Sequence, residues 1–230
     1  MTQRVAMISG ASRGIGASIA QHLAEHGWAV SLGMRDPRAT PIEPSASVLV
    51  CRFDALDPDS EGAWVDETIA RFGRLDGLVH NAGIGARRSV IEATGEEFDA
   101  LFAVNVKSPM RLSQHAWPHL IRSTGRIVVL ASLSGKRVKS AAGGLYAMSK
   151  FAAVGLAHAL RQAGKEAGVR ATAICPAYVA TDMAAGQTTV DPALLTQPED
   201  IARIVHLVLE LPPTASLPEI AINWTVEDCY

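Results

Sequence analysis

The chain has 230 residues, of which 48% are hydrophobic and 19% charged, a balance typical of a folded domain and not of a disordered chain. Its formal net charge is −2, from 21 basic and 23 acidic residues, so no charge excess suggests binding to nucleic acid or to an anionic membrane. No apolar run approaches the ~20 residues of a membrane span, and the apolar start is too short for a signal peptide. We expect a soluble, cytoplasmic protein with a single domain over residues 1–230.

Short apolar runs alternate along the chain with longer amphipathic stretches. Several runs are rich in Val, Ile and Leu without polar alternation, which is typical of strands buried on both faces of a parallel sheet. This alternation predicts a doubly wound α/β fold, a parallel sheet with helices on both faces in three αβα layers. The predicted strands are 5–9, 29–33, 48–53, 78–80, 127–131, 171–175 and 220–222. The predicted helices are 14–26, 60–72, 95–105, 109–123, 144–166 and 198–210.

Residues that favour helix ends stand at several of these boundaries. Thr94 and Glu97 predict a capping box, and Pro109 suits the first turn of its helix. Three glycines follow predicted helix ends, as C-cap glycines do: Gly27, Gly73 and Gly125.

A glycine-rich turn joins the first predicted strand to the first helix. Gly10, Gly14 and Gly16 have the spacing G-x-x-x-G-x-G. Glycines let the backbone approach a pyrophosphate closely, and a helix N-terminus offers free N–H groups. A tight turn without a ligand could have the same glycines. The position of this turn, at the first crossover of a βαβ unit, favours dinucleotide binding.

Arg35 follows the second strand, where many NAD-binding folds have an acidic residue for the ribose 2′-hydroxyl. A guanidinium suits a 2′-phosphate, and Arg13 could reach the same group. Asp36 could pair with Arg35 or lie in solvent, and both arginines could be surface charges. We therefore expect NADP, with NAD as the less favoured cofactor.

Four residues in the middle of the chain predict proton transfer beside such a cofactor. Ser132 follows the fifth strand, Asn105 lies in a predicted helix, and Tyr146 and Lys150 share a helix face at i and i+4. Reducing a carbonyl needs a proton donor, and a nearby ammonium lowers the pKa of a tyrosine, which is ordinarily ~10. A serine hydroxyl can hold the carbonyl oxygen, and an asparagine can order a water. A Tyr-x-x-x-Lys pair alone would be an ordinary helix surface.

The ordered segments make the chain similar to the short-chain dehydrogenase/reductase family along nearly its whole length. The matching segments are 9–16, 53–57, 80–83, 105–106, 132–135, 146–150 and 176–183. The resemblance implies a seven-stranded Rossmann sheet and NAD(P)-dependent oxidoreduction of alcohols or carbonyls. It makes Tyr146 the acid/base, and Lys150 the group that binds the nicotinamide ribose and lowers the tyrosine pKa. Ser132 would orient the substrate, and Asn105 would support a water relay.

The resemblance also implies the residues that contact the cofactor and the substrate. The cofactor set is Gly10, Ser12, Arg13, Gly14, Ile15, Gly16, Arg35, Asp54, Asn81, Ala82, Gly83, Tyr146, Lys150, Pro176, Val179 and Thr181. The substrate set is Ser132, Tyr146, Ala177 and Tyr178. The pocket candidates are mostly apolar, which favours an uncharged substrate: Leu133, Leu145, Ala177, Tyr178, Met183 and Trp224. Arg87 and Arg88 could lie near the rim and bind an acidic group.

The chain departs from the family pattern in a few places. His80 replaces an asparagine and is interpreted as a hydrogen-bonded core histidine, and Ala177 replaces a glycine after Pro176. The segment after Met183 and the C-terminal segment are both short, which predicts an open pocket. The cysteines Cys51 and Cys175 are expected to be buried and Cys229 to be a free thiol. They match no metal spacing, and no metal site is expected.

The sequence therefore predicts an NADP-dependent carbonyl reductase or alcohol dehydrogenase that acts on a small, largely apolar molecule. Two alternatives stay open: an NADP-binding regulatory protein without turnover, and an epimerase or dehydratase of the same family. A homodimer or homotetramer is expected, paired through 95–123 and 144–166. The small residues of the second segment could serve that interface or pack on the chain's own sheet.

Overall fold

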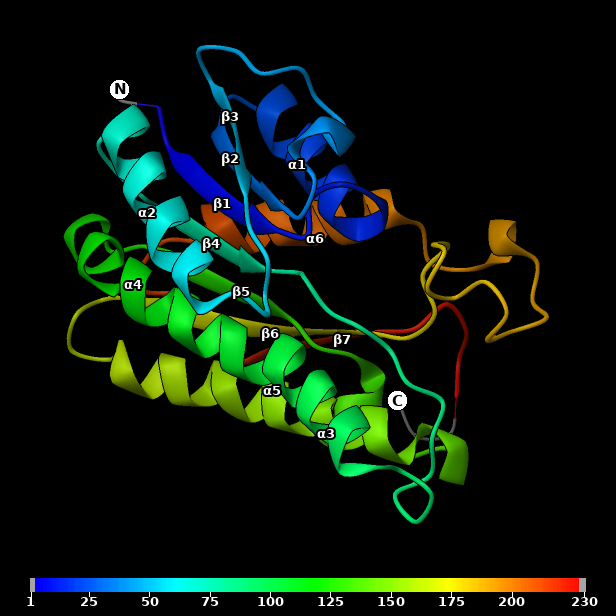
Figure 1. Ribbon diagram of the computed structural model, residues 1–230. Coiled ribbons are helices and arrows are strands. Elements are labelled where there is room, and N and C mark those ends of the chain that lie inside the picture. The colour runs from blue at the N-terminus through cyan, green and yellow to red at the C-terminus, as the bar shows by residue number, and fades with distance from the viewer. Residues whose placement is uncertain (1–2, 228–230) are drawn as a thin grey trace.

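The computed structural model describes residues 3–227, which contain a seven-stranded parallel sheet (Figure 1). The strand order is β3-β2-β1-β4-β5-β6-β7, so the chain starts near the middle of the sheet and winds outward in both directions. The predicted doubly wound fold is confirmed. The strands are β1 Val5–Ser9, β2 Ala29–Met34, β3 Val48–Arg52, β4 Gly77–His80, β5 Arg126–Leu130, β6 Arg170–Pro176 and β7 Glu219–Ile222.

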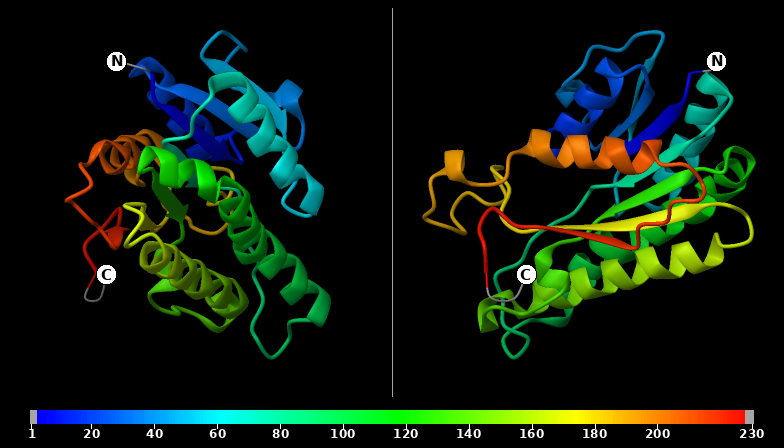
Figure 2. Two further views of the ribbon diagram at one scale, coloured as in Figure 1. Left: turned by 90° about the vertical axis from the view of Figure 1, so that its left-hand side faces the viewer. Right: turned by 180° about the vertical axis from the view of Figure 1, so that it is seen from behind.

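Helices cover both faces of the sheet and complete three layers (Figures 1 and 2). Helices α1 and α6 pack against each other on one face, and α2, α4 and α5 cover the other. The helices are α1 Gly14–Glu25, α2 Pro58–Phe72, α3 Gly95–Phe102, α4 Ser108–Ser123, α5 Gly144–Ala163 and α6 Pro198–Glu210. Each face has its own apolar core, with Trp64 and Leu112 in one and Ile19 and Val205 in the other. Because every strand is parallel, the carboxyl ends of all seven strands meet at one edge of the sheet.

The two helices predicted on either side of Pro109 are joined without a break. A single π-helical turn, Ala103–Lys107, connects α3 to α4, and Pro109 lies in the first turn of α4. The predicted place of Pro109 in a first helical turn is confirmed, whereas the break predicted between residues 105 and 109 is wrong. The π-helical turn continues the helix through these residues, and single π-turns inside helices are frequent at functional sites.

The capping box of Thr94 and Glu97 at the start of α3 is confirmed. Gly27 and Gly73 adopt positive φ angles of 83° and 74°, as C-cap glycines do. Gly125 does not, since Thr124 takes the left-handed conformation at the end of α4, with φ of 50°. Gly125 is needed for space instead, because a Cβ there would lie 2.7 Å from a Leu120 methyl.

Cys51 and Cys175 are buried and free, as predicted, and Cys229 lies outside the described residues. Among residues 3–227, no helix is both long and apolar enough to cross a membrane.

Candidate functional site

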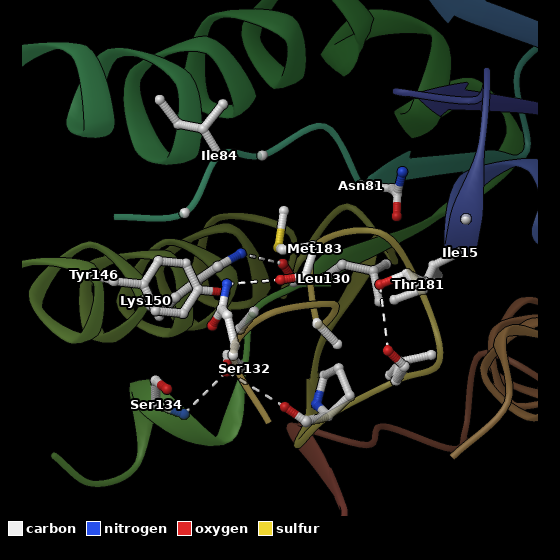
Figure 3. A pocket seen from close by; sticks show the side chains of 18 of the residues that line it. Ile15, Asn81, Ile84, Leu130, Ser132, Ser134, Tyr146, Lys150, Thr181 and Met183 are labelled. Atoms are coloured by element: carbon white, nitrogen blue, oxygen red, sulfur yellow. Dashed lines mark hydrogen bonds between the residues drawn. The ribbon is translucent and has the colours of Figure 1, made fainter. Parts of the chain in front are cut away.

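A cavity of about 1230 Å³ opens at the carboxyl ends of the strands and brings most of the predicted site residues together. Figure 3 shows Ser132, Tyr146 and Lys150 on one side of it, and Asn81, Ile15 and Thr181 on the other. All members of the predicted cofactor set except Gly16 line the cavity, as do all four predicted substrate residues. Asn105 and Gly16 lie behind its wall, among residues that position the lining.

The glycine-rich turn has a backbone that only glycine adopts easily. Gly10 and Gly14 have φ angles of 67° and 56°, in the left-handed region. A Cβ on Gly10 would lie 2.8 Å from the Cα of Ala82, and one on Gly16 would lie 2.3 Å from the carbonyl oxygen of Gly10. The first turn of α1 follows, and no side chain caps it. Its N–H groups therefore remain available for an anion at the cavity wall, as a pyrophosphate requires.

Asn81 and Ser9 fix the shape of this turn. The Nδ2 of Asn81 donates to the carbonyl oxygens of Ser9 and Gly10, each at 3.0 Å. The buried Ser9 hydroxyl accepts the backbone N–H groups of Asn81 and Ala82, at 3.0 and 3.1 Å. The ends of β1 and β4 are thereby joined. The resemblance implied the place of Asn81, but no sequence signal pointed to Ser9.

Asp36 does not pair with Arg35, and it does not lie free in solvent. It forms two hydrogen bonds with the side chain of Arg38, at 2.9 and 3.0 Å, which lower the pKa of its carboxyl group. Arg35 therefore lines the cavity without an acidic partner among the described residues. Arg13 has one, since its Nη1 lies 3.1 Å from Asp182. Both side chains of that pair are exposed, so the interaction is weak and breaks easily.

Ser132 and Tyr146 face each other in the cavity. The Oγ of Ser132 accepts the backbone N–H of Ser134 at 3.0 Å and donates to the carbonyl oxygen of Pro176 at 3.3 Å. Burial raises the pKa of Tyr146 to about 12, although its hydrogen bond with Ser132 works in the opposite direction. The expected lowering of the tyrosine pKa is therefore not found. The phenol stays protonated at neutral pH and is available as a proton donor.

Lys150 lies one helical turn from Tyr146 and is buried. Its ammonium group donates to the carbonyl oxygen of Leu130 at 2.9 Å and lies 5.7 Å from the centre of the Tyr146 ring. Burial, and not this ammonium group, dominates the pKa of the tyrosine. Burial also lowers the pKa of Lys150 itself, to about 8.

Asn105 lies in the π-helical turn, where its amide is fully used by protein groups. Its Oδ1 accepts the N–H of Ile84 at 2.9 Å, and its Nδ2 donates to the Ile84 carbonyl and to Ser149 Oγ, both at 3.0 Å. The Ser149 hydroxyl in turn donates to the carbonyl oxygen of Tyr146 at 2.8 Å. Asn105 thus ties the loop around Ile84 to the helix that carries Tyr146, and its part in a water relay stays a prediction.

His80 is a core residue, as predicted, but only one of its two ring nitrogens has a hydrogen-bond partner among the described residues. Its Nε2 lies 2.8 Å from Ser113, whose hydroxyl donates to Pro109, so the Nε2–H must be the donor. The Nδ1 is buried without a hydrogen-bond partner among the described residues. Burial lowers the pKa of His80 to about 3, so the ring is neutral and takes no proton at ordinary pH.

The part of the cavity wall that was predicted to contact the substrate is less apolar than expected. Leu145 is buried outside the cavity, and Arg88 pairs with Glu97 instead of reaching the rim. Leu133, Ala177, Tyr178, Met183, Trp224 and Arg87 do line it.

Two basic side chains that the sequence analysis did not identify also lie on this wall. Arg137 and Lys139 both contact the carboxylate of Glu227. The Nε and Nη1 of Arg137 have no partner among the described residues.

Comparison with known proteins identifies the family of the chain. The family model described as short chain dehydrogenase matches residues 4–191. The agropine synthesis reductase of Rhizobium rhizogenes is 38% identical over 98% of this chain and 54% of its own length. The chain thus spans about half the length of this relative. The oxidoreductase UcpA of Escherichia coli strain K12 is 34% identical over 80% of this chain and 72% of its own length.

Two solved structures are similar over nearly the whole chain. An alcohol dehydrogenase from the archaeon Thermococcus sibiricus, complexed with 5-hydroxy-NADP, has a TM-score of 0.86 and 27% identity, covering 98% of this chain and 99% of the other. A metagenomic short-chain oxidoreductase in complex with NADP has a TM-score of 0.81 and 29% identity, covering 97% and 98%. The chain belongs to the short-chain dehydrogenase/reductase family.

Proposed function

We propose that the protein is an NADP-dependent oxidoreductase that transfers hydride between the cofactor and a carbonyl or alcohol, with Tyr146 as the acid/base. The observation that carries the proposal is one cavity with the glycine-rich turn on one side and Ser132, Tyr146 and Lys150 on the other. The first group fits a dinucleotide, and the second fits proton transfer to an oxygen.

Arg35 supports NADP over NAD. Its guanidinium has no acidic partner among the described residues, because Asp36 is held by Arg38. A 2′-phosphate can therefore pair with Arg35 without displacing a carboxylate. Both similar solved structures hold NADP or its 5-hydroxy form.

When bound, the cofactor would supply the hydride for the carbonyl carbon. Ser132 would hold the substrate oxygen by a hydrogen bond throughout, and Tyr146 would donate its proton to that oxygen as negative charge develops. Lys150 holds positive charge near the resulting phenolate, fixed in place by the Leu130 carbonyl. In the oxidative direction the same proton returns to Tyr146.

The test is turnover of NADPH with a panel of aldehydes and ketones by the wild-type protein and by Tyr146→Phe. The substitution removes the proton donor and should lower kcat by about 10²–10⁴-fold. NADPH affinity, measured by fluorescence titration, should change less than about twofold. Wild-type protein that binds NADPH but reduces nothing in the panel would favour a regulatory protein. Product formed without net loss of NADPH would favour an epimerase or dehydratase.

The cavity supports a substrate with an apolar reacting end and an anionic far end. Leu133, Ala177 and Met183 surround the space beside the catalytic group. Farther along the wall, Arg137 and Lys139 hold the carboxylate of Glu227. A carboxylate or phosphate on the substrate can take the place of Glu227 there, because the guanidinium of Arg137 and the ammonium of Lys139 donate to either anion.

Arg137→Met tests this substrate class. It should lower kcat/KM for ketones that carry a carboxylate by roughly tenfold, a loss of about 1.4 kcal/mol. Uncharged ketones should be affected less than about twofold. Arg88→Met is the matched control, since Arg88 lies outside the cavity. Equal losses for charged and uncharged ketones would contradict an anionic far end.

A further inference from the structure

Three histidines meet on the face of the molecule formed by α1 and α6. His22 and His26 stand at i and i+4 at the C-terminal end of α1, and His206 lies on the neighbouring α6 (Figures 1 and 2). Helix α1 begins at the cofactor cavity and runs away from it. The described residues that line the cavity include none of the three. The cluster is therefore separate from the site described above.

The rings are close enough to share one ligand. Nε2 of His22 lies 3.1 Å from Nδ1 of His206, and one nitrogen from each ring lies within 4.8 Å of the other two. The rings of His22 and His26 stack with centres 4.1 Å apart, and His206 stands edge-on to both at about 5 Å. Zinc–nitrogen distances of ~2.0–2.1 Å place the nitrogens of a tetrahedral site about 3.3 Å apart. His22 and His206 are already at about that spacing, so a shift of the exposed His26 ring by up to about 1.5 Å would complete it.

Neighbouring groups already orient two of the rings as ligands. Nδ1 of His26 lies 2.7 Å from the His22 carbonyl and must donate to it, which leaves the lone pair on Nε2. Nε2 of His206 faces the Glu210 carboxylate at 3.4 Å, which leaves the lone pair on Nδ1, toward His22. A carboxylate or a carbonyl behind each ligating histidine is the usual second layer of a metal site. Glu210 is itself held by Trp28 and Arg4.

We propose that His22, His26 and His206 bind one divalent transition-metal ion, of the kind that prefers imidazole, such as Zn²⁺. Three neutral imidazoles with water in the fourth position match the chemistry of that ion. His22 joins by moving its proton from Nε2 to Nδ1, so no redox step or net charge change on the ring is required. The ion would connect the end of α1 to α6 and stabilise the packing of the two helices.

The experiment is calorimetric titration of Zn²⁺ into protein freed of any affinity tag and dialysed against a chelator. Wild-type protein should bind one Zn²⁺ per chain, and its melting temperature should rise with added Zn²⁺. His26→Gln, on the exposed member, should weaken binding at least tenfold and abolish the melting shift without affecting the fold measured by circular dichroism. His206→Gln should do the same.

His119→Gln, a histidine on α4 far from the cluster in sequence, is the matched control and should bind Zn²⁺ as the wild type does. Absence of Zn²⁺ binding by the wild-type protein would overturn the proposal. Equal binding by wild type, His26→Gln and His206→Gln would also overturn it, because the ion would then lie elsewhere. None of these readouts depends on turnover, so the result is independent of the proposed enzyme activity.

Discussion

Lys150 is buried beside Tyr146, and its charge is stabilised by the Leu130 carbonyl and little else in its surroundings. Burial lowers its pKa from 10.5 to about 8, while the unfolded chain keeps the ordinary value. Between those pH values the unfolded state binds more protons than the folded state, so stability rises with pH there. Below about pH 8 the destabilisation is fully present. The residue thus weakens the fold at neutral pH in order to place an ammonium at the site.

Lys150→Met should reveal how much the buried charge of Lys150 lowers the free energy of unfolding. The free energy of unfolding of the wild type, taken relative to Lys150→Met, should increase by roughly 3 kcal/mol from about pH 8 to 10.5, because one pKa unit is worth about 1.4 kcal/mol. Urea denaturation of both proteins across that range measures it. Burial raises the pKa of Tyr146 to about 12, so its phenol stays protonated in both folded proteins across this range and contributes nearly equally to both. A difference that does not change with pH would show that the Lys150 charge is not desolvated.

The catalytic side chains were predictable from sequence because their motif is local. Their hydrogen-bond partners were not predictable, because they lie far away along the chain. Tyr146 and Lys150 stand four residues apart in one helix. The groups that hold them come from other elements: Leu130 from β5 and Pro176 from β6. The histidine cluster was even less predictable from sequence, since His206 lies 184 residues from His22 along the chain. Only the packing of α1 on α6 brings them together.

At the scale of elements, the π-helical turn is the feature that the sequence pattern misread. The sequence predicted two separate helices, 95–105 and 109–123, with Pro109 in the first turn of the second. The turn instead widens at Ala103–Lys107 and continues into α4. Its hydrogen bonds place Asn105 inward, toward Ile84 and Ser149. The same π-helical turn therefore joins the two helices and sets the direction of the Asn105 side chain.

Asn105→Ala should disturb the cavity through the loop around Ile84. Removing the amide deprives the part-buried N–H and carbonyl of Ile84 of their protein partners, which should lower the free energy of unfolding by about 1 kcal/mol. The loop forms part of the cavity wall, so KM for the substrate should rise and kcat should fall. Steady-state kinetics and urea denaturation measure both effects.

Ser149→Ala is the control for Asn105, because it removes only one of the three contacts of that side chain. It should have a smaller effect on both KM and stability. A fall in kcat for Asn105→Ala with KM and stability unchanged would contradict the positioning role. That result would favour the water relay instead.

At the scale of the molecule, the outer face of α5 is the surface that the strand and helix pattern leaves unassigned. The small residues of α5 divide between two faces: Ala147, Ala153 and Ala157 are buried within the chain, whereas Gly155 and Ala159 are exposed. The fold was predictable from strand and helix alternation, since it depends on patterns that recur along the whole chain. Which helix face meets solvent and which meets a partner is not encoded in that alternation, because both faces of α5 have small residues.

Gly155 supports a second chain packed on the outer face of α5. A Cβ there would meet nothing within 4 Å in this chain, so a glycine that costs a helix about 1 kcal/mol serves no packing within it. Phe151 and Met148 lie one and two turns away and expose 46% and 43% of their surface.

We expect a homodimer or homotetramer by light scattering. Gly155→Arg should convert it to a smaller species, because an arginine blocks close approach of a second helix. Leu194→Glu, on an exposed loop, should leave the assembly intact. A wild-type protein that scatters as a monomer, or a Gly155→Arg variant of unchanged mass, would exclude this face as the interface.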